Sequence, residues 1–337
     1  MGTAPTNKTP FRLAELKYKR KDQPLDLSDV LDLSDVEKLP EGLRRVELNL
    51  PRQEAVVETG WDIAENPVAY EYERAPGLII LPNVLPPRTQ RTLIRKTLLR
   101  DIAKPYNKGN LTPFYPFIPG GLFAAAIATQ QQSEEEQTLD LVQPLQDHLK
   151  PMSVRELLEK KLRWITLGHQ YDWTSKTYPP SPPPPFPTDI ALLSSRLVSV
   201  LPSSTHTWLA QTAIVNFYSP GDTLSPHTDH SEPNHTAPLL SLSLGCSAIF
   251  LMGRETKDVA PLAILVRSGD AVVMTGKARM GFHAVPRVIE GTCPGYLGEV
   301  GGQGEGEDGW VEEFAGYMRG KRVNLNVRQV DLDVDEA

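Results

Sequence analysis

The sequence predicts an α+β fold whose carboxy-terminal part is an antiparallel β-sandwich, jelly roll or barrel. From about residue 208 onward, short apolar runs follow one another, and Gly, Pro or Asp lie between most of them. Many short strands separated by turn residues are typical of such architectures. Helix-like patterns lie in the chain before this part. The runs that we interpret as strands are AIVNFY, LLSLSLG, SAIFLMG, LAILVRSGDAVVM and RVNLNVRQV.

The composition argues against several classes of protein. The chain has 337 residues, 40% of them hydrophobic, and a formal net charge of −7. Its two cysteines cannot form a disulfide scaffold, so we expect an intracellular protein in the nucleus or cytoplasm, with the mitochondrion as the alternative. No apolar run approaches the roughly 18 residues that span a membrane, so we expect no membrane partner. The acidic total does not by itself indicate nucleic acid, although local basic patches can coexist with it.

We divide the chain into three parts. Residues 1–60 form an N-terminal extension with a basic stretch and a duplicated DLSDV motif. Residues 61–200 form a lid and buttressing region, interrupted by insertions that are rich in Pro or in Gln and Glu. Residues 201–337 contain the predicted strands and form the core.

A strongly basic helix is predicted at 88–104, after a strand-like run at 75–87. In RTQRTLIRKTLLRDIAK, apolar residues form one stripe, and six arginines and lysines occupy most of the remainder. The basic face is either solvated or in contact with phosphates. A further helix begins after Ser153, because Glu156 follows it in a capping-box pattern.

His227 and Asp229 form a candidate metal site. One residue separates them, and residues i and i+2 of a strand point to the same face. A third ligand must come from elsewhere in the chain, and His283 follows another strand-like segment. Two histidines and one carboxylate on a β scaffold make the facial triad of non-haem Fe(II) oxygenases. Taken alone, a His-x-Asp motif marks a polar loop more often than a metal site.

The last predicted strand carries two arginines that need an explanation. Arg322 and Arg328 are six residues apart, so both point to one face of the strand, together with Asn324. Two inward arginines in a barrel need an anion, and a dicarboxylate suits them because each guanidinium can bind a carboxylate as a fork. The alternative is that both lie on a solvated sheet face, while the intervening apolar residues face the core.

With these motifs in this order, the sequence resembles the AlkB family of Fe(II)- and 2-oxoglutarate-dependent dioxygenases, and most of all the eukaryotic AlkB homologue 1 group. The resemblance covers roughly residues 61 to 330. It implies a double-stranded β-helix, or jelly-roll, core at 201–337, with buttressing helices and an N-terminal lid or extension. The motifs that carry it are NFY, HTD, LLSLSLGCSAIFLMG, SGDAVVMTGKARMGFHAVPR, RVNLNVR and, upstream, LRWITLGHQYDW.

The resemblance implies that His227, Asp229 and His283 bind Fe(II) and form the catalytic centre. The family oxidises methyl groups on the nitrogens of nucleobases in DNA or RNA, and we expect this activity here, with transfer RNA among the substrates. The base is expected to be flipped out or single-stranded, the protein to be a monomer, and Lys257 to lie near a substrate phosphate. The alternatives are a protein substrate such as a histone, and a catalytically silent nucleic-acid-binding module.

The resemblance also assigns the cosubstrates, which are 2-oxoglutarate and O2. Arg322 with Tyr218 would hold the distal carboxylate of 2-oxoglutarate. Arg328 with Asn216 would hold the carboxylate beside the metal, and Asn324 completes the predicted cosubstrate site.

The segment LGHQYDW corresponds to the lid that stacks aromatic side chains on the base in this family. His169, Tyr171 and Trp173 would do so here, and the alternative is that the tyrosine and tryptophan only pack the lid. Some AlkB proteins have a carboxylate two residues after the Asp ligand. Here that position is Ser231, followed by Glu232, so these two residues are expected to influence the choice of substrate.

Overall fold

The structure is a computed structural model, and it describes residues 8–34, 40–49, 61–130, 141–172, 177–179, 182–202, 208–300 and 310–331. The predicted substrate residue Trp173 and the Gln- and Glu-rich stretch at 131–140 lie outside the described residues. Among the helices that are described, none combines the length and the apolar character needed to cross a membrane.

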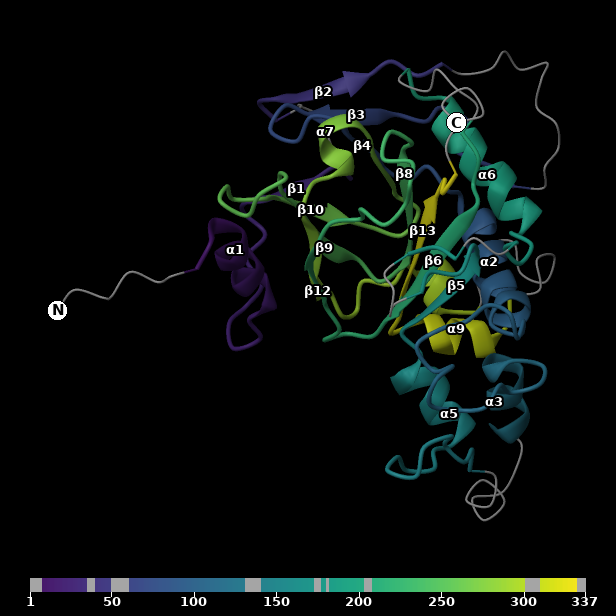
Figure 1. Ribbon diagram of the computed structural model, residues 1–337. Helices are drawn as coiled ribbons and strands as arrows, with labels where there is room; N and C mark the ends of the chain where they lie inside the picture. The colour runs from purple at the N-terminus through teal and green to yellow at the C-terminus, as the bar shows by residue number, and fades with distance from the viewer. Residues whose placement is uncertain are drawn as a thin grey trace.

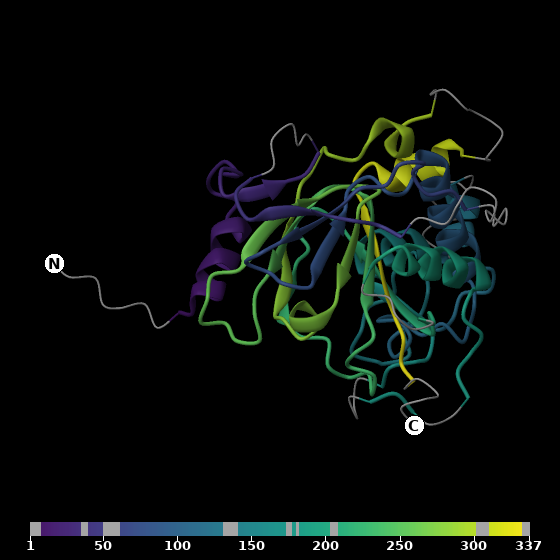
Figure 2. The ribbon, with the colours of Figure 1, turned by 90° about the horizontal axis from the view of Figure 1, so that it is seen from above.

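Two β-sheets pack face to face in the described chain (Figures 1 and 2). Their strands are antiparallel to their neighbours, except that the edge strand β1 runs parallel to β10. The smaller sheet has the order β1 (Val30–Asp32), β10 (Leu262–Val266), β9 (Ala248–Met252), β12 (His283–Val288), β7 (Leu224–His227). The larger sheet has the order β2 (Leu43–Val46), β3 (Ala69–Tyr72), β4 (Leu78–Leu81), β11 (Ala271–Met274), β8 (Leu239–Gly245), β13 (Arg322–Arg328), β6 (Thr212–Tyr218), β5 (Trp164–Gly168).

Apolar side chains from both sheets form the core between them. Ile80 and Val272 of the larger sheet share one buried cluster with Met252 and Ile264 of the smaller sheet. Alternate residues of a strand face opposite sides, so each strand also presents a second face. This arrangement confirms the predicted jelly-roll core, and its larger sheet includes strands β2–β5, which lie upstream of residue 201.

Helices cover the outer face of the larger sheet (Figures 1 and 2). Val323, Leu325 and Val327 of β13 pack into this helical layer, so the opposite face of β13 points between the sheets. The predicted cap of Ser153 is confirmed, because its hydroxyl accepts a hydrogen bond of 3.2 Å from the Glu156 amide. The helical elements on this side are α2 (Pro87–Lys96), η2 (Thr97–Asp101), α3 (Leu122–Gln130), α5 (Val154–Glu156), η3 (Leu157–Lys161), α6 (Thr188–Ser199), α8 (Gly295–Gly298) and α9 (Glu312–Met318).

The basic helix predicted at 88–104 forms as α2 and the π-helical turn η2, and three of its cations are neither free nor simply solvated. Arg91 is buried and donates to the Tyr296 carbonyl at 2.8 Å. Lys96 and Arg100 both bind the Asp189 carboxylate at 2.6 Å. These cations therefore tie α2 and η2 to neighbouring elements.

The described part of residues 1–60 is built into the core rather than attached to it. Helix α1 (Pro10–Lys19) buries Phe11 and Tyr18 against the outer face of the smaller sheet. Strand β1 extends that sheet, and Asp32 at its end pairs with Arg267 at 2.6 Å. Strand β2 extends the larger sheet by pairing with β3. The boundary drawn at residue 60 is therefore not a boundary between packed units.

Candidate active site

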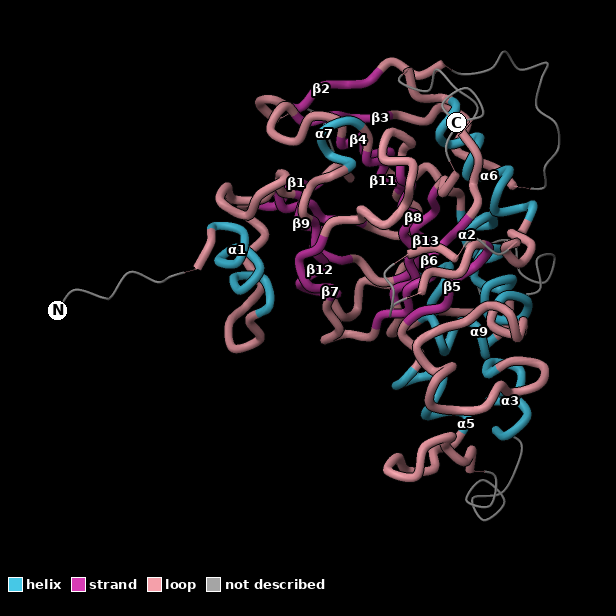
Figure 3. Tube along the Cα trace, in the orientation of Figure 1, coloured by secondary structure: helices cyan, strands magenta, loops and turns pink. Residues whose placement is uncertain are grey.

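The three predicted metal ligands meet at the open end of the smaller sheet. His227 is the last residue of β7, and His283 is the first residue of the neighbouring β12 and lies opposite it in the register (Figure 3). Asp229 follows β7 by two residues. One ligand atom from each residue can be chosen so that all lie within 4.8 Å of one another. The long-range pairing of β7 with β12 therefore completes a site of which only two members are close in sequence.

The two imidazole rings are oriented so that the same nitrogen of each is free for a metal. Nδ1 of His227 lies 3.0 Å from the Ser225 carbonyl, and Nδ1 of His283 lies 3.1 Å from the Gly281 carbonyl. A carbonyl only accepts, so each Nδ1 carries the proton and each Nε2 offers its lone pair. Both Nε2 atoms lie 3.7 Å from the Asp229 carboxylate. Such orientation by backbone carbonyls is typical of metal-binding histidines.

The electrostatics favour the forms of these ligands that bind cations. Burial alone would raise the pKa of Asp229, but Arg328 and the two histidines together hold it well below its usual range. Burial lowers the pKa of His283 to about 4, so its ring is neutral at neutral pH. Two neutral imidazoles and one carboxylate are the donor set of non-haem Fe(II) sites, and the residues therefore fit this metal.

A buried ionic network lies behind the metal ligands and holds Asp229 in place. The two terminal nitrogens of Arg328 bind Asp229 and Glu232, each at 2.8 Å. Arg279 binds the other oxygen of Glu232 at 3.0 Å, and the Tyr178 hydroxyl donates to Glu232 at 3.0 Å. Glu232 is only 1% exposed. We expected it to influence the substrate, and the structure instead places it as the centre of this network.

Arg328 and Asn216 have protein partners where a cosubstrate contact was expected. The fork of Arg328 is filled by Asp229 and Glu232, and only its buried Nε has no partner among the described residues. The Asn216 amide lies 3.5 Å from the Asn324 side-chain oxygen. We therefore assign Arg328 first to the metal loop, and its contact with 2-oxoglutarate stays a prediction.

Arg322, at the other end of β13, is buried without a carboxylate partner. It lies opposite Tyr218 in the register, and its terminal nitrogens contact the Ser243 hydroxyl at 2.9 Å and the Cys246 carbonyl at 3.4 Å. It is 3% exposed, its Nε has no partner, and no carboxylate of the described residues forms an ion pair with it. Burial raises the pKa of Tyr218 to about 12, so its hydroxyl stays protonated. These residues fit an incoming carboxylate, such as the distal one of 2-oxoglutarate.

The lid segment leaves β5 through a sharp turn at Gly168. This residue has a φ of +70°, and a Cβ here would lie 2.1 Å from the Gln211 carbonyl, so the position requires glycine. His169 and Tyr171 follow directly. The Tyr171 hydroxyl accepts a hydrogen bond of 3.1 Å from Ser231, two residues after Asp229. The lid is therefore connected to the metal loop through a position that sequence analysis associated with substrate choice.

Tyr178 makes a second connection between the lid and the metal loop. Its ring packs edge-on against Tyr171, with ring centroids 5.4 Å apart, and its edge contact with His169 spans 6.3 Å. Burial raises the pKa of Tyr178, so its hydroxyl stays a donor to Glu232. Two predicted lid residues, His169 and Tyr171, thus contact Tyr178, while the third, Trp173, lies outside the described residues.

Lys257 lies on the loop between β9 and β10 and contacts the residue that precedes one of the metal ligands. Its ammonium group is 4.4 Å from the centroid of the Phe282 ring, and Phe282 directly precedes His283. A cation over an aromatic face is attracted by the ring quadrupole, so this contact occupies the side chain.

Three residues of the site were missed from the sequence. Asn326 donates to Asp229 at 3.2 Å and shares its strand face with Arg322 and Arg328, so the alternation of β13 could have revealed it. Arg279 and Tyr178 had no comparable signal, because both reach Glu232 from segments distant in the chain.

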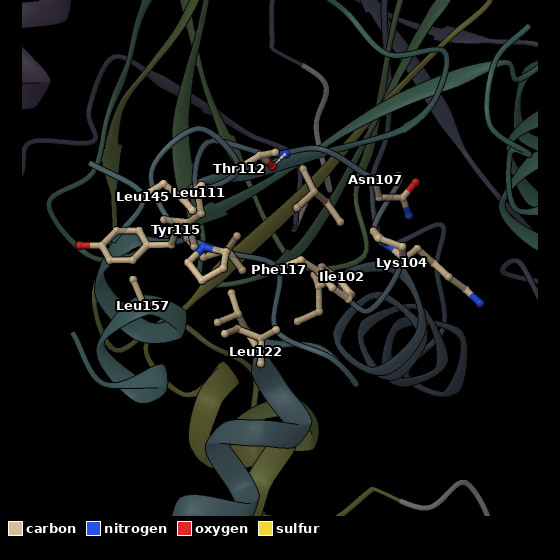
Figure 4. Close-up of a pocket in the computed structure, with 16 residues that line it drawn as sticks. Ile102, Lys104, Asn107, Leu111, Thr112, Tyr115, Phe117, Leu122, Leu145 and Leu157 are labelled. Carbon is tan, nitrogen blue, oxygen red and sulfur yellow. Dashed lines mark hydrogen bonds between the residues drawn. The ribbon is translucent and has the colours of Figure 1, made fainter. Parts of the chain in front are cut away.

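An apolar cavity of about 170 Å³ lies in the helical layer, away from these residues (Figure 4). Figure 4 shows Leu111, Phe117, Leu122 and Leu157 around it. Among the described residues that line it there is no metal ligand and no predicted substrate residue. This cavity is therefore separate from the candidate active site.

Comparison with known proteins agrees with this geometry. Residues 117–328 match the model of the 2OG-Fe(II) oxygenase superfamily. The tRNA demethylase abh1 of Schizosaccharomyces pombe is 41% identical over 322 residues, which cover 95% of each chain. The N6-methyladenosine RNA demethylase ALKB1 of Pyricularia oryzae is 36% identical over 304 residues, covering 82% of this chain and 81% of that one. The DNA N(6)-methyladenine demethylase ALKBH1A of Arabidopsis thaliana is 30% identical over 354 residues, covering 96% of both.

The metal ligands, the buried Arg322 without a carboxylate partner among the described residues and these similarities agree on one conclusion. The chain belongs to the 2OG-Fe(II) oxygenase superfamily and, within it, to the AlkB-type dioxygenases, which use Fe(II), 2-oxoglutarate and O2.

Proposed function

We propose that this dioxygenase removes methyl groups from the nitrogens of nucleobases, and that transfer RNA is its main substrate. The relative named as a tRNA demethylase has 41% identity and covers 95% of both chains. Other relatives are named for RNA or for DNA, and their identities of 36% and 30% are lower. The similarity therefore favours RNA over DNA, and transfer RNA among RNAs.

The observation that carries the proposed chemistry is the pairing of a complete metal triad with an unpaired buried arginine between the same two sheets. Iron, when bound with 2-oxoglutarate and O2, would supply the oxidation: one oxygen atom would enter the methyl group, which then leaves as formaldehyde, and the other would convert 2-oxoglutarate into succinate and CO2. His227, Asp229 and His283 would hold the iron, and Arg322 with Tyr218 would hold the distal carboxylate of 2-oxoglutarate. Such preorganised charges need no rearrangement when their ligands arrive.

The lid contacts suggest how a base would enter. Tyr171 and His169 offer ring faces on which a base can stack, once the base has left its own stack. The Ser231 hydroxyl now donates to Tyr171. A base that accepts from Ser231 would therefore exchange one hydrogen bond for another, and a serine would discriminate between bases less strongly than a carboxylate.

The test is turnover by the full-length protein with Fe(II), 2-oxoglutarate and a panel of methylated substrates. The panel contains methylated transfer RNA, single-stranded DNA with the same methylated bases, and a methyl-lysine histone peptide. Formaldehyde and succinate are measured together, with His227→Ala and an iron chelator as controls. We expect coupled products with transfer RNA at the highest kcat/KM. Preference for the peptide, or turnover that survives removal of iron, would contradict the proposal.

A further inference from the structure

A basic hollow of about 420 Å³ is lined by residues that belong to none of the groups described above. Three segments line it: the turn between β3 and β4 with Arg74, the loop after β9 with Arg254, and the short helix α7 (Gly276–Arg279) with Lys277. Figure 1 shows α7 beside β3 and β4. We call this hollow the basic groove. The remaining residues that line it are Ala75, Pro76, Gly253, Glu255, Thr256, Val259 and Ala278.

The three cations of the basic groove lack protein partners. Arg74, Arg254 and Lys277 are exposed, and none of their side chains forms a hydrogen bond or ion pair within the described chain. Glu255 is the one acidic residue among those that line it, so the lining has an excess of two positive charges. The whole chain has a net charge of −7, so the charge of the groove lining is opposite in sign to that of the protein. Elsewhere, Lys96, Arg100 and Arg328 are bound to carboxylates.

The walls of the basic groove are joined to one another by backbone hydrogen bonds. The Thr275 amide, before α7, donates to the Gly77 carbonyl at 2.8 Å, which joins α7 to the turn that carries Arg74. The Gly253 amide donates to Phe282 at 2.8 Å, and the Phe282 amide donates to Arg254 at 2.9 Å. The backbone positions that carry the three cations are therefore held relative to one another by the fold.

The same walls also support the metal ligands. Phe282, which is bonded to Arg254, directly precedes His283. Arg279, two residues after Lys277, donates to the Asp229 carbonyl and binds Glu232. Arg254 is thus hydrogen-bonded to the residue before one metal ligand, and Lys277 lies on the same short helix as the arginine that donates to another. An anion in the groove would lie beside a base held at the metal.

We propose that the basic groove binds the phosphodiester backbone next to the target nucleotide, an inference that rests on the proposed nucleic-acid substrate. Unpaired arginines and lysines with fixed spacing are suited to phosphates, which attract them irrespective of base sequence. Lys257, which sequence analysis placed at the phosphate, does not line the groove and lies over Phe282 instead. The groove therefore supplies the affinity that the acidic protein as a whole does not.

The test is the triple variant Arg74→Gln, Arg254→Gln, Lys277→Gln in the full chain. Binding to a methylated oligoribonucleotide is measured by fluorescence anisotropy from 50 to 300 mM salt. Each lost phosphate contact lowers the slope of log K against log salt by about 1, so the slope should fall by about 2 to 3. The KM for the oligonucleotide should rise at least about tenfold, as weaker binding at the lower salt predicts. The KM for 2-oxoglutarate and turnover of the free methylated nucleoside, which has no phosphodiester, should not change.

A matched control removes three exposed cations from the helical side of the molecule, with Arg88→Gln, Lys104→Gln and Lys150→Gln. It changes net charge by the same amount and should leave both the KM for the oligonucleotide and the salt slope close to those of the wild type. Equal effects of the two triple variants would overturn the groove as a site. So would an unchanged slope in the groove variant while the wild type demethylates the oligonucleotide. If the wild type demethylates no nucleic acid, the proposed function itself fails.

Discussion

Arg322 and Arg328 occupy the two ends of one strand, β13, on the same face, and both are buried between the sheets. Their surroundings are nevertheless opposite. Arg328 is bound by two carboxylates of the protein, whereas Arg322 has only a hydroxyl and a carbonyl. Burying a charge is costly unless an opposite charge compensates it. The comparison therefore separates a cation that the protein uses to hold its own metal ligand from one that has no carboxylate partner in the described chain and that we propose binds an external anion.

The largest effect is expected from Arg328→Ala, which leaves Asp229 and Glu232 with reduced compensation in a buried site. Removing one partner of a buried ion pair typically costs about 3–5 kcal/mol, so the free energy of unfolding should fall by that amount. Urea denaturation and Fe(II) titration measure the loss of stability and of metal affinity. Arg328→Lys keeps the charge but cannot bind two carboxylates as a fork, so its free energy of unfolding and its Fe(II) affinity should lie between those of the wild type and of Arg328→Ala. An unfolding curve like that of the wild type would show that the network is not structural.

Arg322→Ala should weaken cosubstrate binding without lowering the free energy of unfolding, because it removes a buried charge that has no carboxylate partner within the described structure. We expect a rise in the KM for 2-oxoglutarate of about a hundredfold, which corresponds to about 3 kcal/mol. The free energy of unfolding without cosubstrate should be unchanged or higher. Steady-state kinetics and urea denaturation of the same preparation give both numbers. A loss of stability as large as that of Arg328→Ala would remove the distinction between the two arginines.

Ligand-dependent stabilisation gives a third, smaller difference between the two ends of β13. 2-Oxoglutarate at about a hundred times its Kd should raise the free energy of unfolding of the wild type by about 2.7 kcal/mol. Arg322→Ala should show almost none of this gain at the same concentration. Denaturation with Mn(II) in place of Fe(II) avoids turnover. Tyr218→Phe is the matched milder variant, and it should retain most of the stabilisation.

The smallest effect is expected from Tyr178→Phe, which removes one donor from Glu232 but leaves Arg279 and Arg328 in place. The loss should be about 1.5 kcal/mol, the lower end for a hydrogen bond to a charged group, because the two arginines still compensate the carboxylate. A double-mutant cycle with Glu232→Gln isolates the pair. Strict additivity of the two changes would mean that the lid and the metal loop are not coupled through this bond.

Some of this site could be predicted from residue spacing alone. The alternation of β13 places Arg322, Asn324 and Arg328 on one face, and it would have placed Asn326 there too. The His-x-Asp motif supplied two ligands at one strand end. The partners of Arg328 could not be predicted in this way, because Asp229 and Glu232 lie 99 and 96 positions away in the chain. The basic helix at 88–104 shows the same limit, since Asp189 reaches it from α6.

The sequence by itself determined the class of fold, the metal ligands and the face of β13 that carries charge, because strand periodicity is local and the motifs are ordered along the chain. The tertiary structure alone decided which charges are satisfied. It paired Arg328 with two carboxylates and gave Arg322 none among the described residues. It also placed the Tyr178 hydroxyl where it donates to Glu232, and it brought Arg74, Arg254 and Lys277 to one groove. The physical reason is that the free energy of a buried or clustered charge depends on partners contributed by distant segments. The spacing of residues along the chain does not predict which distant segments meet.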